Sequence, residues 1–360
     1  MPAVSATLAE EAIQLLIALI QTPSFSREET QTADLIFEFL TRHGAQPQRK
    51  GHNVWARNRH FDTTKPTILL NSHHDTVKPG ATWTYDPFGA VVEEDRLTGL
   101  GSNDAGASAV SLLATFLHFY AQENLPYNLI CAITAEEEIS GAGGIRSVLP
   151  ELGEIALGIV GEPTQMDLAI AEKGLVVLDC VAHGRTGHAA REEGENALYK
   201  AVADIQWLKD FRFPKVSELL GPVKMTVTQI QAGSQHNVVP DRCTFVVDVR
   251  TNELYSNPEV VELVRQYISS EVTPRSMHLN SSRIAPEHPL VQRGLDLGRR
   301  TFGSVTLSDQ SMMPFTTVKI GPGDSARSHT PDEYILLSEI RQGIQGYVDL
   351  LTGLELENKD

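Results

Sequence analysis

The stretch TILLNSHHDTV, residues 67–77, decides the fold, because an apolar run typical of a buried strand ends abruptly in polar side chains. His73 and Asp75 stand directly after this run, where we expect the carboxyl end of the strand. In open α/β sheets, ligands collect outside the carboxyl ends of the strands. The stretch therefore predicts both an inner strand and one side of a functional site.

Other segments repeat this arrangement, each placing carboxylate or imidazole groups close after an apolar run or at the start of a helix. They are Asp104 after GLGS, the triplet Glu136, Glu137 and Glu138 after NLICAIT, Glu162 after IALGIVG, and His329 after TTVKIGPG. Oxygen and nitrogen donors from distant parts of the chain thus converge on one edge of the predicted sheet. A hydrolytic site with two metal ions is typically assembled in this way.

Length and charge restrict the class of protein. A chain of 360 residues suggests two domains, and its apolar fraction is sufficient for a sizeable core. The formal charge is −16 without a basic cluster, which argues against nucleic acid or an anionic membrane as a partner. We therefore expect a small-molecule substrate, and an anionic one requires locally placed arginine or lysine.

The cysteines and the N-terminal segment indicate the compartment. The three cysteines, Cys131, Cys180 and Cys243, lie inside strand-like runs, which favours buried thiols in a reducing environment. We expect no secretory leader, because the apolar run 13–20 is short and follows two glutamates. No window reaches the roughly 20 apolar residues needed to span a bilayer. These features predict a cytoplasmic protein.

The order of segments predicts two domains, one inserted in the other. Residues 1–173 alternate strand-like and helix-like segments, and a capping-box spacing of Ser26 and Glu29 predicts a helix start there. Residues 174–283 follow the β-α-β-β-α-β order of a ferredoxin-like α+β domain, with RSMHLNSS (275–282) as its last strand. Residues 284–360 resume the first pattern. We predict an α/β fold in which a discontinuous catalytic domain has a mixed sheet flanked by helices.

Each candidate residue also has an ordinary structural explanation. A histidine at a strand end is often a solvated loop residue, and Asp104 suits the positive end of a helix dipole. Three adjacent glutamates are harder to explain, since their carboxylates repel one another and a cation relieves the repulsion. A donor set of His, Asp and Glu without Cys suits two Zn²⁺ ions, with Co²⁺ or Mn²⁺ as substitutes. Asp75 is the expected partner of the other ring nitrogen of His73, and His74 is expected to point to the opposite face.

A set of motifs in a fixed order supports this interpretation. They are SHHDTV (72–77), GSNDAGAS (101–108), TAEEE (134–138), GEPT (161–164), GRTGHAA (184–190), NVVPD (237–241), DVR (248–250) and GPGDSARSHTPDEY (321–334). Over essentially its whole length, the chain resembles the two-zinc family of aminoacylases, acetylornithine deacetylase, succinyl-diaminopimelate desuccinylase and related carboxypeptidases. The closing motif most resembles the acetylornithine deacetylase branch. The inserted domain then corresponds to a lid that also forms a homodimer interface.

The resemblance implies a role for each matching residue. Asp104 bridges two zinc ions, one of which also binds His73 and Glu162, while the other binds Glu138 and His329. Glu137 is the general base and Asp75 the partner of His73. The implied lid and substrate-binding residues are His188, which stabilises the oxyanion in a neighbouring subunit, Asn237 and Arg250, which hold the substrate carboxylate, and Gly323 in the closing loop.

The predicted activity is metal-dependent hydrolysis of the amide bond of an Nα-acyl amino acid. N-acetylornithine is the favoured substrate, in arginine biosynthesis, with N-acetylcitrulline or N-succinylornithine as related ones. Arg327 lies close in sequence to His329, and we expect it either to receive a succinyl carboxylate or to be an ordinary surface residue. A dipeptidase, a carboxypeptidase or succinyl-diaminopimelate desuccinylase remains an alternative, as does a non-catalytic metal-dependent binding protein. The last class has no need of a general base.

Overall fold

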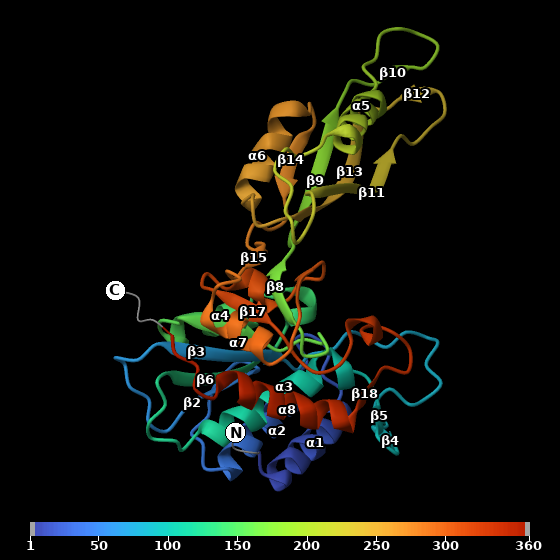
Figure 1. Ribbon diagram of the computed structural model, residues 1–360. Helices are drawn as coiled ribbons and strands as arrows, with labels where there is room; N and C mark the ends of the chain where they lie inside the picture. Colours follow the sequence, from blue (N-terminus) through green and yellow to red (C-terminus); the bar gives the residue numbers. More distant parts are fainter. Residues whose placement is uncertain (1–3, 357–360) are drawn as a thin grey trace. The chain divides into compact units, whose positions relative to one another are not determined.

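The computed structural model describes residues 4–356, which belong to two compact units (Figure 1). Unit 1 contains the chain up to Ile170, Arg283–Phe302 and the chain from Ser308 onward. Unit 2 contains Ala171–Ser282 and the short return Gly303–Leu307. Within residues 4–356, no helix combines the length and the apolar character that crossing a membrane requires.

A nine-stranded mixed sheet organises unit 1. In hydrogen-bonded order its strands are β1 (Gln48–Lys50), β2 (Asn53–Arg57), β6 (Asn128–Thr134), β3 (Thr67–His73), β7 (Leu157–Val160), β17 (Thr317–Lys319), β8 (Leu168–Glu172) and β15 (Ser282–Arg283), with β16 (Thr301–Ser304) beside β8. Neighbours among β6, β3, β7 and β17 are parallel. The carboxyl ends of these four strands therefore meet along one edge, as the sequence predicted.

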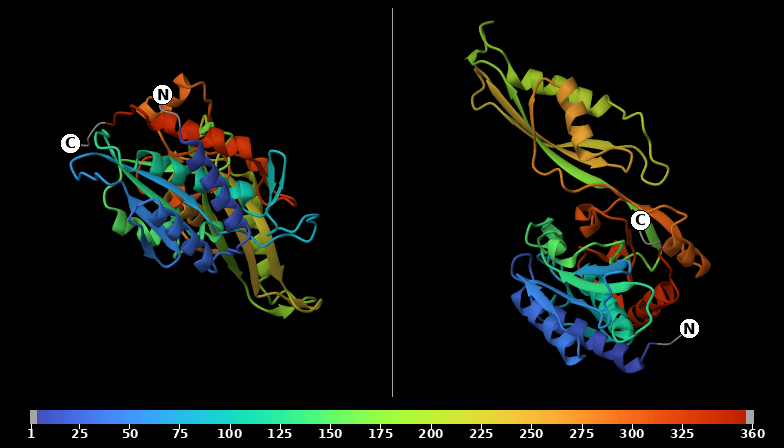
Figure 2. Two further views of the ribbon diagram at one scale, coloured as in Figure 1. Left: turned by 90° about the horizontal axis from the view of Figure 1, so that it is seen from below. Right: turned by 90° about the vertical axis from the view of Figure 1, so that its left-hand side faces the viewer.

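Helices cover both faces of this sheet (Figures 1 and 2). On one side of β2, β3 and β6 lie α1 (Ala6–Ile20), α2 (Thr30–Arg42), α3 (Ala107–Phe119) and α8 (Leu337–Leu351). On the other lies α4 (Ile145–Leu152), whose Ile145 and Val148 pack with Trp55 and Leu69 of the sheet. All seven residues of β3 are buried, and so are all seven of β6. Two covered faces explain why these strands read as continuous apolar runs.

A small second sheet joins distant parts of unit 1. Its order is β18 (Tyr334–Leu336), β5 (Arg96–Thr98) and β4 (Val91–Glu93), all antiparallel. The pairing of β18 with β5 brings the loop after β17 against the loop that precedes α3. The segments around His329 and Asp104 are thereby held side by side.

Unit 2 is a four-stranded antiparallel sheet with helices on one face. Its order is β11 (Lys224–Ala232), β13 (Arg242–Thr251), β9 (Gly174–His183) and β14 (Glu271–Pro274), with α5 (Ala197–Asp210) and α6 (Asn257–Tyr267) sharing its core. A two-stranded ribbon, β10 (Gly187–His188) with β12 (Val238–Val239), extends from it. The chain order β9-α5-β11-β13-α6-β14 is the predicted one.

Two local predictions were wrong. The last strand of unit 2 is β14, not 275–282, because the chain pairs with β9 soon after α6 ends and buries Val272 there. Helix α2 begins at Thr30, not after Ser26. The Ser26 hydroxyl instead donates to Asp75, and the Glu29 carboxylate accepts from the backbone N–H groups of Arg27 and Glu136. Long-range hydrogen bonds therefore replace the expected capping box.

The buried inner strand β3 generates a stability prediction. Leu70→Ala should lower the free energy of unfolding by about 2–5 kcal/mol, because Leu70 is fully buried and truncation leaves a cavity. Val92→Ala on β4 is the control, since Val92 is 46% exposed and its truncation should change stability by at most about 0.5 kcal/mol. Urea denaturation followed by circular dichroism measures both. Equal effects would show that β3 is not part of the stabilising core.

Candidate metal centre

The carboxyl ends of the four parallel strands carry most of the predicted donors. His73 ends β3, Glu162 follows β7, and His329 lies in the loop after β17. Glu138 belongs to a single 3₁₀ turn, η2 (Glu137–Ile139), that follows β6. Asp104 comes from the other direction, in the turn η1 (Ser102–Gly106) that leads into α3.

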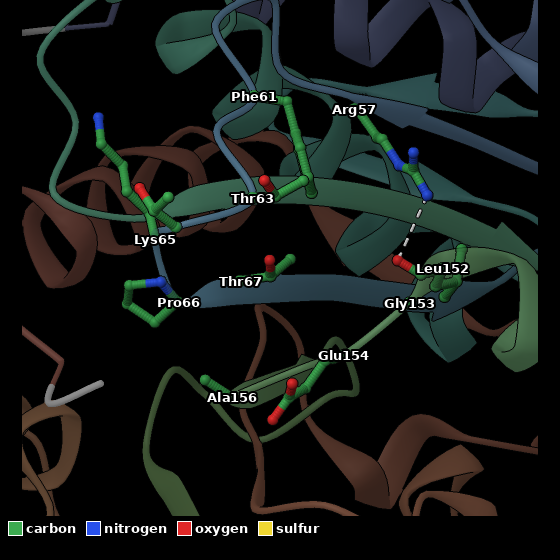
Figure 3. A pocket seen from close by; sticks show the side chains of 11 residues that line it. Arg57, Phe61, Thr63, Lys65, Pro66, Thr67, Leu152, Gly153, Glu154 and Ala156 are labelled. Carbon is green, nitrogen blue, oxygen red and sulfur yellow. Dashed lines mark hydrogen bonds between the residues drawn. The ribbon is translucent and has the colours of Figure 1, made fainter. Parts of the chain in front are cut away.

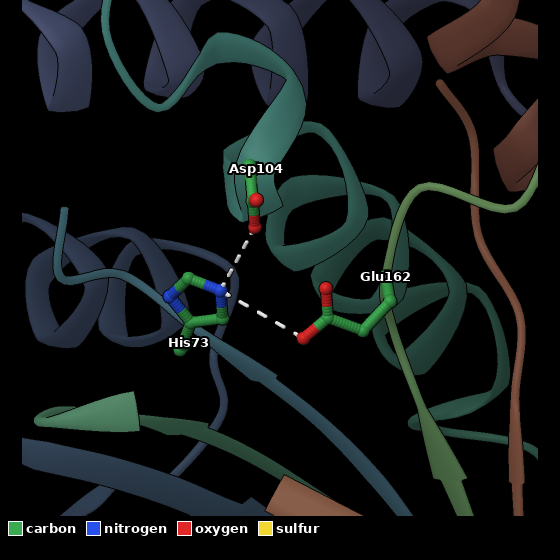
Figure 4. A group of neighbouring side chains, drawn as sticks. All are labelled: His73, Asp104 and Glu162. Atoms are coloured by element: carbon green, nitrogen blue, oxygen red, sulfur yellow. Dashed lines mark hydrogen bonds and ion pairs between the residues drawn. The ribbon is translucent and has the colours of Figure 1, made fainter. Parts of the chain in front are cut away.

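A first group of donors consists of His73, Asp104 and Glu162 (Figure 4). His73 Nε2 lies 3.3 Å from Asp104 Oδ1 and 3.8 Å from Glu162 Oε1. His73 is 1% exposed and Glu162 is 9% exposed, so these donors are largely shielded from solvent. They come from three separate segments that the sheet and α3 bring together.

A second group consists of Asp104, Glu138 and His329. His329 Nε2 lies 3.0 Å from Glu138 Oε2 and 3.7 Å from Asp104 Oδ2. Asp104 thus belongs to both groups and presents Oδ1 to one histidine and Oδ2 to the other. An amide at this position has one acceptor oxygen and is unable to do the same.

Asp75 supports these donors from behind. Its carboxylate is fully buried and accepts the backbone N–H groups of Glu137 at 3.0 Å and Glu138 at 3.2 Å. His73 Nδ1 donates to the backbone carbonyl of Asp75 at 3.0 Å, while the carboxylate oxygen Oδ1 lies 3.5 Å away. The nearer partner of this ring nitrogen is therefore the backbone of Asp75, and not the carboxylate that the sequence suggested. Either partner leaves Nε2 of His73 available to a metal.

His74 lies on the opposite face, as expected from its position in an extended segment. Its Nδ1 is 2.9 Å from the Thr32 hydroxyl, and its Nε2 donates to the backbone carbonyl of His52 at 3.0 Å. Burial lowers the pKa of His74 to about 4. His74 is thus a neutral packing residue beneath α2 and does not belong to either donor group.

The protonation tendencies of the donors show an excess of negative charge. Burial opposes the charged form of His73, but its hydrogen bond with Asp104 and further carboxylates outweigh burial and raise its pKa well above the usual range. Burial raises the pKa of the Glu137 carboxyl well above its usual range. The hydrogen bond with Glu138 raises the pKa of His329 to about 9. The raised pKa values of both histidines show that the surrounding carboxylates favour a positive charge at this place.

The donor set fits divalent metal ions. Donor atoms of each group lie within 4.8 Å of one another, and ligands of one tetrahedral zinc ion are roughly 3.3 Å apart. A divalent cation stabilises carboxylates and takes the place of the imidazole proton, so it removes the charge imbalance of the cluster. The structure thus brings together all five predicted ligands in two groups that share Asp104.

The three adjacent glutamates point in different directions. Glu137 Oε2 lies 3.9 Å from His73 Nε2, and its side chain is 13% exposed, so its carboxylate faces the first group. Glu138 belongs to the second group. The Glu136 carboxylate turns away and accepts the backbone N–H of Gly143 at 3.2 Å. The left-handed conformation of Glu136, with φ at 55°, produces this divergence.

Three further predicted residues lie in unit 2. His188 and Asn237 are exposed on the β10–β12 ribbon, where the Asn237 carbonyl accepts the N–H of Ala189 at 3.0 Å. Arg250, in β13, makes a bidentate ion pair with Asp248, with distances of 2.8 and 3.0 Å. Within unit 2 the ribbon brings His188 and Asn237 close together, whereas Arg250 belongs to the sheet.

Two predicted residues flank His329 in unit 1. Gly323 has φ at 88°, and a Cβ there would lie 2.3 Å from Asn103 Oδ1, so glycine is required. Arg327 forms a bidentate ion pair with Glu339, at 2.7 and 3.1 Å, and its guanidinium lies 4.4 Å from the centre of the Tyr334 ring. The charge of Arg327 is therefore compensated inside the protein, and its role as a substrate ligand stays a prediction.

Sequence reasoning missed three residues that hold the donor-bearing turns. Glu333 accepts hydrogen bonds from the turn of Asp104, Asn103 contacts the loop of His329, and Glu29 accepts the N–H of Glu136. All three are buried. Asn103 and Glu333 belong to motifs already noted, GSNDAGAS (101–108) and GPGDSARSHTPDEY (321–334), but their positions alone predicted no role.

A pocket of about 520 Å³ lies elsewhere in unit 1 (Figure 3). Thr67, at the amino end of β3, lines it together with Arg57, Phe61 and Glu154. The donors lie at the carboxyl end of the same strand, and none of the eleven lining residues is among them. The chemistry belongs at the donor groups, because they contain the convergent titratable side chains.

The shared position of Asp104 generates a metal-binding prediction. Glu162→Ala and Glu138→Ala should each lower the number of tightly bound zinc ions from two to one, whereas Asp104→Ala should weaken both. Glu136→Ala is the matched control, because its carboxylate faces Gly143 instead of a donor group. Elemental analysis after gel filtration gives the ratio of metal to protein. Loss of both ions in every variant would contradict two distinct groups.

Comparisons with known proteins agree with this geometry. The chain is 26% identical to succinyl-diaminopimelate desuccinylase 2 of a Ruegeria species, over 72% of this chain and 70% of the relative. Aminopeptidase PepT from Bacillus cereus has a similar fold, with a TM-score of 0.75, 17% identity and coverage of 95% of this chain and 98% of that one. A dinuclear metal-binding peptidase of family M20 from Bacillus subtilis also has a similar fold. Its TM-score is 0.72 and its identity 17%, with coverage of 97% of this chain and 99% of that one.

These relatives do not support the acetylornithine deacetylase branch, which the closing motif had favoured. At this level of identity the solved structures establish the fold alone. The predicted α/β fold, with a mixed sheet flanked by helices, is confirmed. The family description "Peptidase family M20/M25/M40" matches residues 69–353, which is most of the chain. The protein therefore belongs to peptidase family M20/M25/M40 and is an enzyme of that metallopeptidase and amidohydrolase family.

Proposed function

We propose that this protein is a two-metal amidohydrolase that removes the acyl group from an Nα-acyl amino acid, with an N-succinyl diamino acid such as N-succinyl-diaminopimelate as its first candidate substrate. The observation that carries the proposal is the division of the two Asp104 oxygens between two donor groups, with the Glu137 carboxylate beside them. Binding alone does not require this additional carboxylate. A hydrolase does, because a proton must move during the reaction.

The residues of the chain would act as follows. His73, Asp104 and Glu162 would hold one zinc ion, and Asp104, Glu138 and His329 the other. When bound, the two ions would polarise the amide carbonyl and make water more acidic. Glu137 Oε2 would take a proton from the attacking water and deliver it to the leaving amine nitrogen. Asp75 would keep His73 and the Glu137 turn in place during both transfers.

Polar residues outside the two donor groups would recognise the substrate. An enzyme with a net charge of −16 needs local cations to hold an anionic substrate. Arg250 would exchange its bidentate pairing with Asp248 for the substrate α-carboxylate, and Asn237 would assist it. His188 would donate a hydrogen bond to the oxyanion in the neighbouring subunit of a homodimer formed through unit 2. The loop at Gly323, which adjoins the segment of His329, would contact the substrate near the donor groups.

The choice of acyl group follows the curated relative. The Ruegeria protein is named as a succinyl-diaminopimelate desuccinylase, and its similarity covers 72% of this chain. That similarity favours a succinyl over an acetyl substrate. A short peptide is the second candidate, because the fold of this chain resembles that of an aminopeptidase and its donor set is not specific to one amide.

A substrate panel tests the proposal. Zinc-reconstituted protein is incubated with N-succinyl-diaminopimelate, N-succinylornithine, N-acetylornithine and a dipeptide, and release of the free amine is measured. We expect the succinylated diamino acid to react fastest, by at least about tenfold in kcat/KM. A faster dipeptide would make the protein a peptidase. Two bound metal ions without turnover of any substrate would favour a metal-dependent binding protein.

The position of Glu137 generates a prediction about proton transfer. Glu137→Gln should lower kcat by about a hundredfold to ten-thousandfold, because the amide keeps the shape but has no basic oxygen to accept a proton. Zinc content should remain at two ions per chain, as measured by elemental analysis. Glu136→Gln, with its side chain directed at Gly143, is the control that should keep normal turnover. A Glu137→Gln variant with normal kcat would exclude the general-base role.

The proposed action of His188 between subunits generates a complementation prediction. His188→Ala should lower kcat about a hundredfold or more, the loss typical of one missing oxyanion donor, with little loss of metal. Mixing His188→Ala with Glu137→Gln protein should restore part of the activity, because one site of each mixed dimer then contains both native side chains. Steady-state assays after subunit exchange measure the recovery. Full activity of a monomer would contradict the action across subunits.

A further inference from the structure

Two buried side chains connect the turn that carries Asp104 to the loop that carries His329. Asn103 is fully buried and precedes Asp104, while Glu333 is 2% exposed and lies between His329 and β18, directly before the strand. We call this pair the clamp. Each of its members reaches across to the segment that contains the other.

Glu333 binds the backbone of the Asp104 turn. Its Oε1 accepts the N–H groups of Asn103 at 2.8 Å and Asp104 at 2.9 Å, and its Oε2 accepts the N–H of Gly101 at 3.2 Å. Its own backbone carbonyl accepts the N–H of Gly99 at 2.9 Å, which continues the pairing of β18 with β5. One carboxylate thus holds three backbone N–H groups of the single segment that carries Asp104.

Asn103 binds in the reverse direction. Its Oδ1 accepts the N–H of Asp324 at 3.0 Å, and its Nδ2 donates to the Asp324 carbonyl at 3.1 Å and to the Ser328 hydroxyl at 3.4 Å. Ser328 is the residue before His329. The side-chain amide therefore holds both ends of the turn that presents this histidine. The chemistry matches, since an amide offers one acceptor and two donors to a backbone segment that needs both.

We propose that Asn103 and Glu333 are positioning residues that set the separation of Asp104 and His329. Through this separation they set the affinity of the second donor group for its metal ion. The inference rests on the proposed two-metal function. His73 and Glu162 of the first group are fixed by β3 and by the end of β7, independently of the clamp. His329 lies in a loop and has φ at 57°. No strand fixes its backbone, so contacts from other segments must do so. Two donors of the second group, Asp104 and His329, depend on the clamp, whereas only Asp104 of the first group does, so loosening the clamp should affect the second group most.

The expected loss of metal affinity follows from the known effect of residues that orient metal ligands. Removing such a partner typically lowers metal affinity about tenfold to a hundredfold. Glu333→Gln replaces an acceptor oxygen by an NH₂ group that opposes a backbone N–H, and Asn103→Ala removes all three contacts to the His329 loop. We expect each variant to weaken the second ion about tenfold or more, and the first ion about threefold or less.

A metal titration of the whole protein tests the inference. Apoprotein prepared with a chelator is titrated with Zn²⁺ in competition with a chromophoric chelator, and the two dissociation constants are fitted separately. Co²⁺ absorption spectra report the coordination of each ion, and thermal unfolding of the apoprotein checks the fold. Asp332→Asn is the matched control, because its carboxylate accepts the N–H groups of Thr84 and Tyr85, at 2.8 and 3.1 Å, instead of those of the Asp104 turn.

The outcomes separate the inference from the function on which it rests. If the native protein binds fewer than two ions, the proposed function fails. If it binds two and the folded clamp variants bind the second ion as tightly as Asp332→Asn does, the positioning role is excluded while the function stands. If one variant does not fold, the other decides. If neither folds, Asn103 and Glu333 are structural residues and the inference is also overturned.

Discussion

The burial of the Asp75 carboxylate is the constraint on which the site depends. A buried carboxylate is costly unless hydrogen bonds satisfy it, and Asp75 obtains them from Ser26 and from the backbone of Glu137 and Glu138. Satisfying this one group fixes the turn after β6 relative to the end of β3. The histidine at that end, His73, is oriented by the same residue. The Asp75 carboxylate thus fixes the end of β3 and the turn after β6 relative to each other before any metal is bound.

The sequence was sufficient where chemistry and periodicity coincide. The inner strands were recognisable because burial on both faces makes them uniformly apolar, and the donors stand where those strands end. Asp104, Glu162 and His329 were predicted as ligands from residue type and position, and the structure brings them into two groups. Their convergence follows from the parallel strands, which place the carboxyl ends of distant segments next to one another.

Sequence reasoning failed where a tertiary contact competes with a local pattern. Ser26 and Glu29 have the spacing of a capping box, but their oxygens bind Asp75 and the Glu136 backbone instead. The role of Glu333 could not be predicted from its neighbours in sequence, because its carboxylate binds three N–H groups more than 200 positions earlier in the chain. The strand at 271–274 was misplaced because β-pairing with β9, not apolar alternation, selects it. Such partners are absent from any short window.

The position of β17 beside β7 has a consequence for biosynthesis. A ribosome makes β3, β6 and β7 before the whole of unit 2, and β17 only after it. During that interval the nascent chain presents β7 as an open sheet edge, which is a hazard for aggregation. His329 and Glu333, whose carboxylate holds the segment of Asp104, have also not yet been synthesised. A chain that stops within unit 2 therefore retains an exposed strand edge together with an incomplete set of donors.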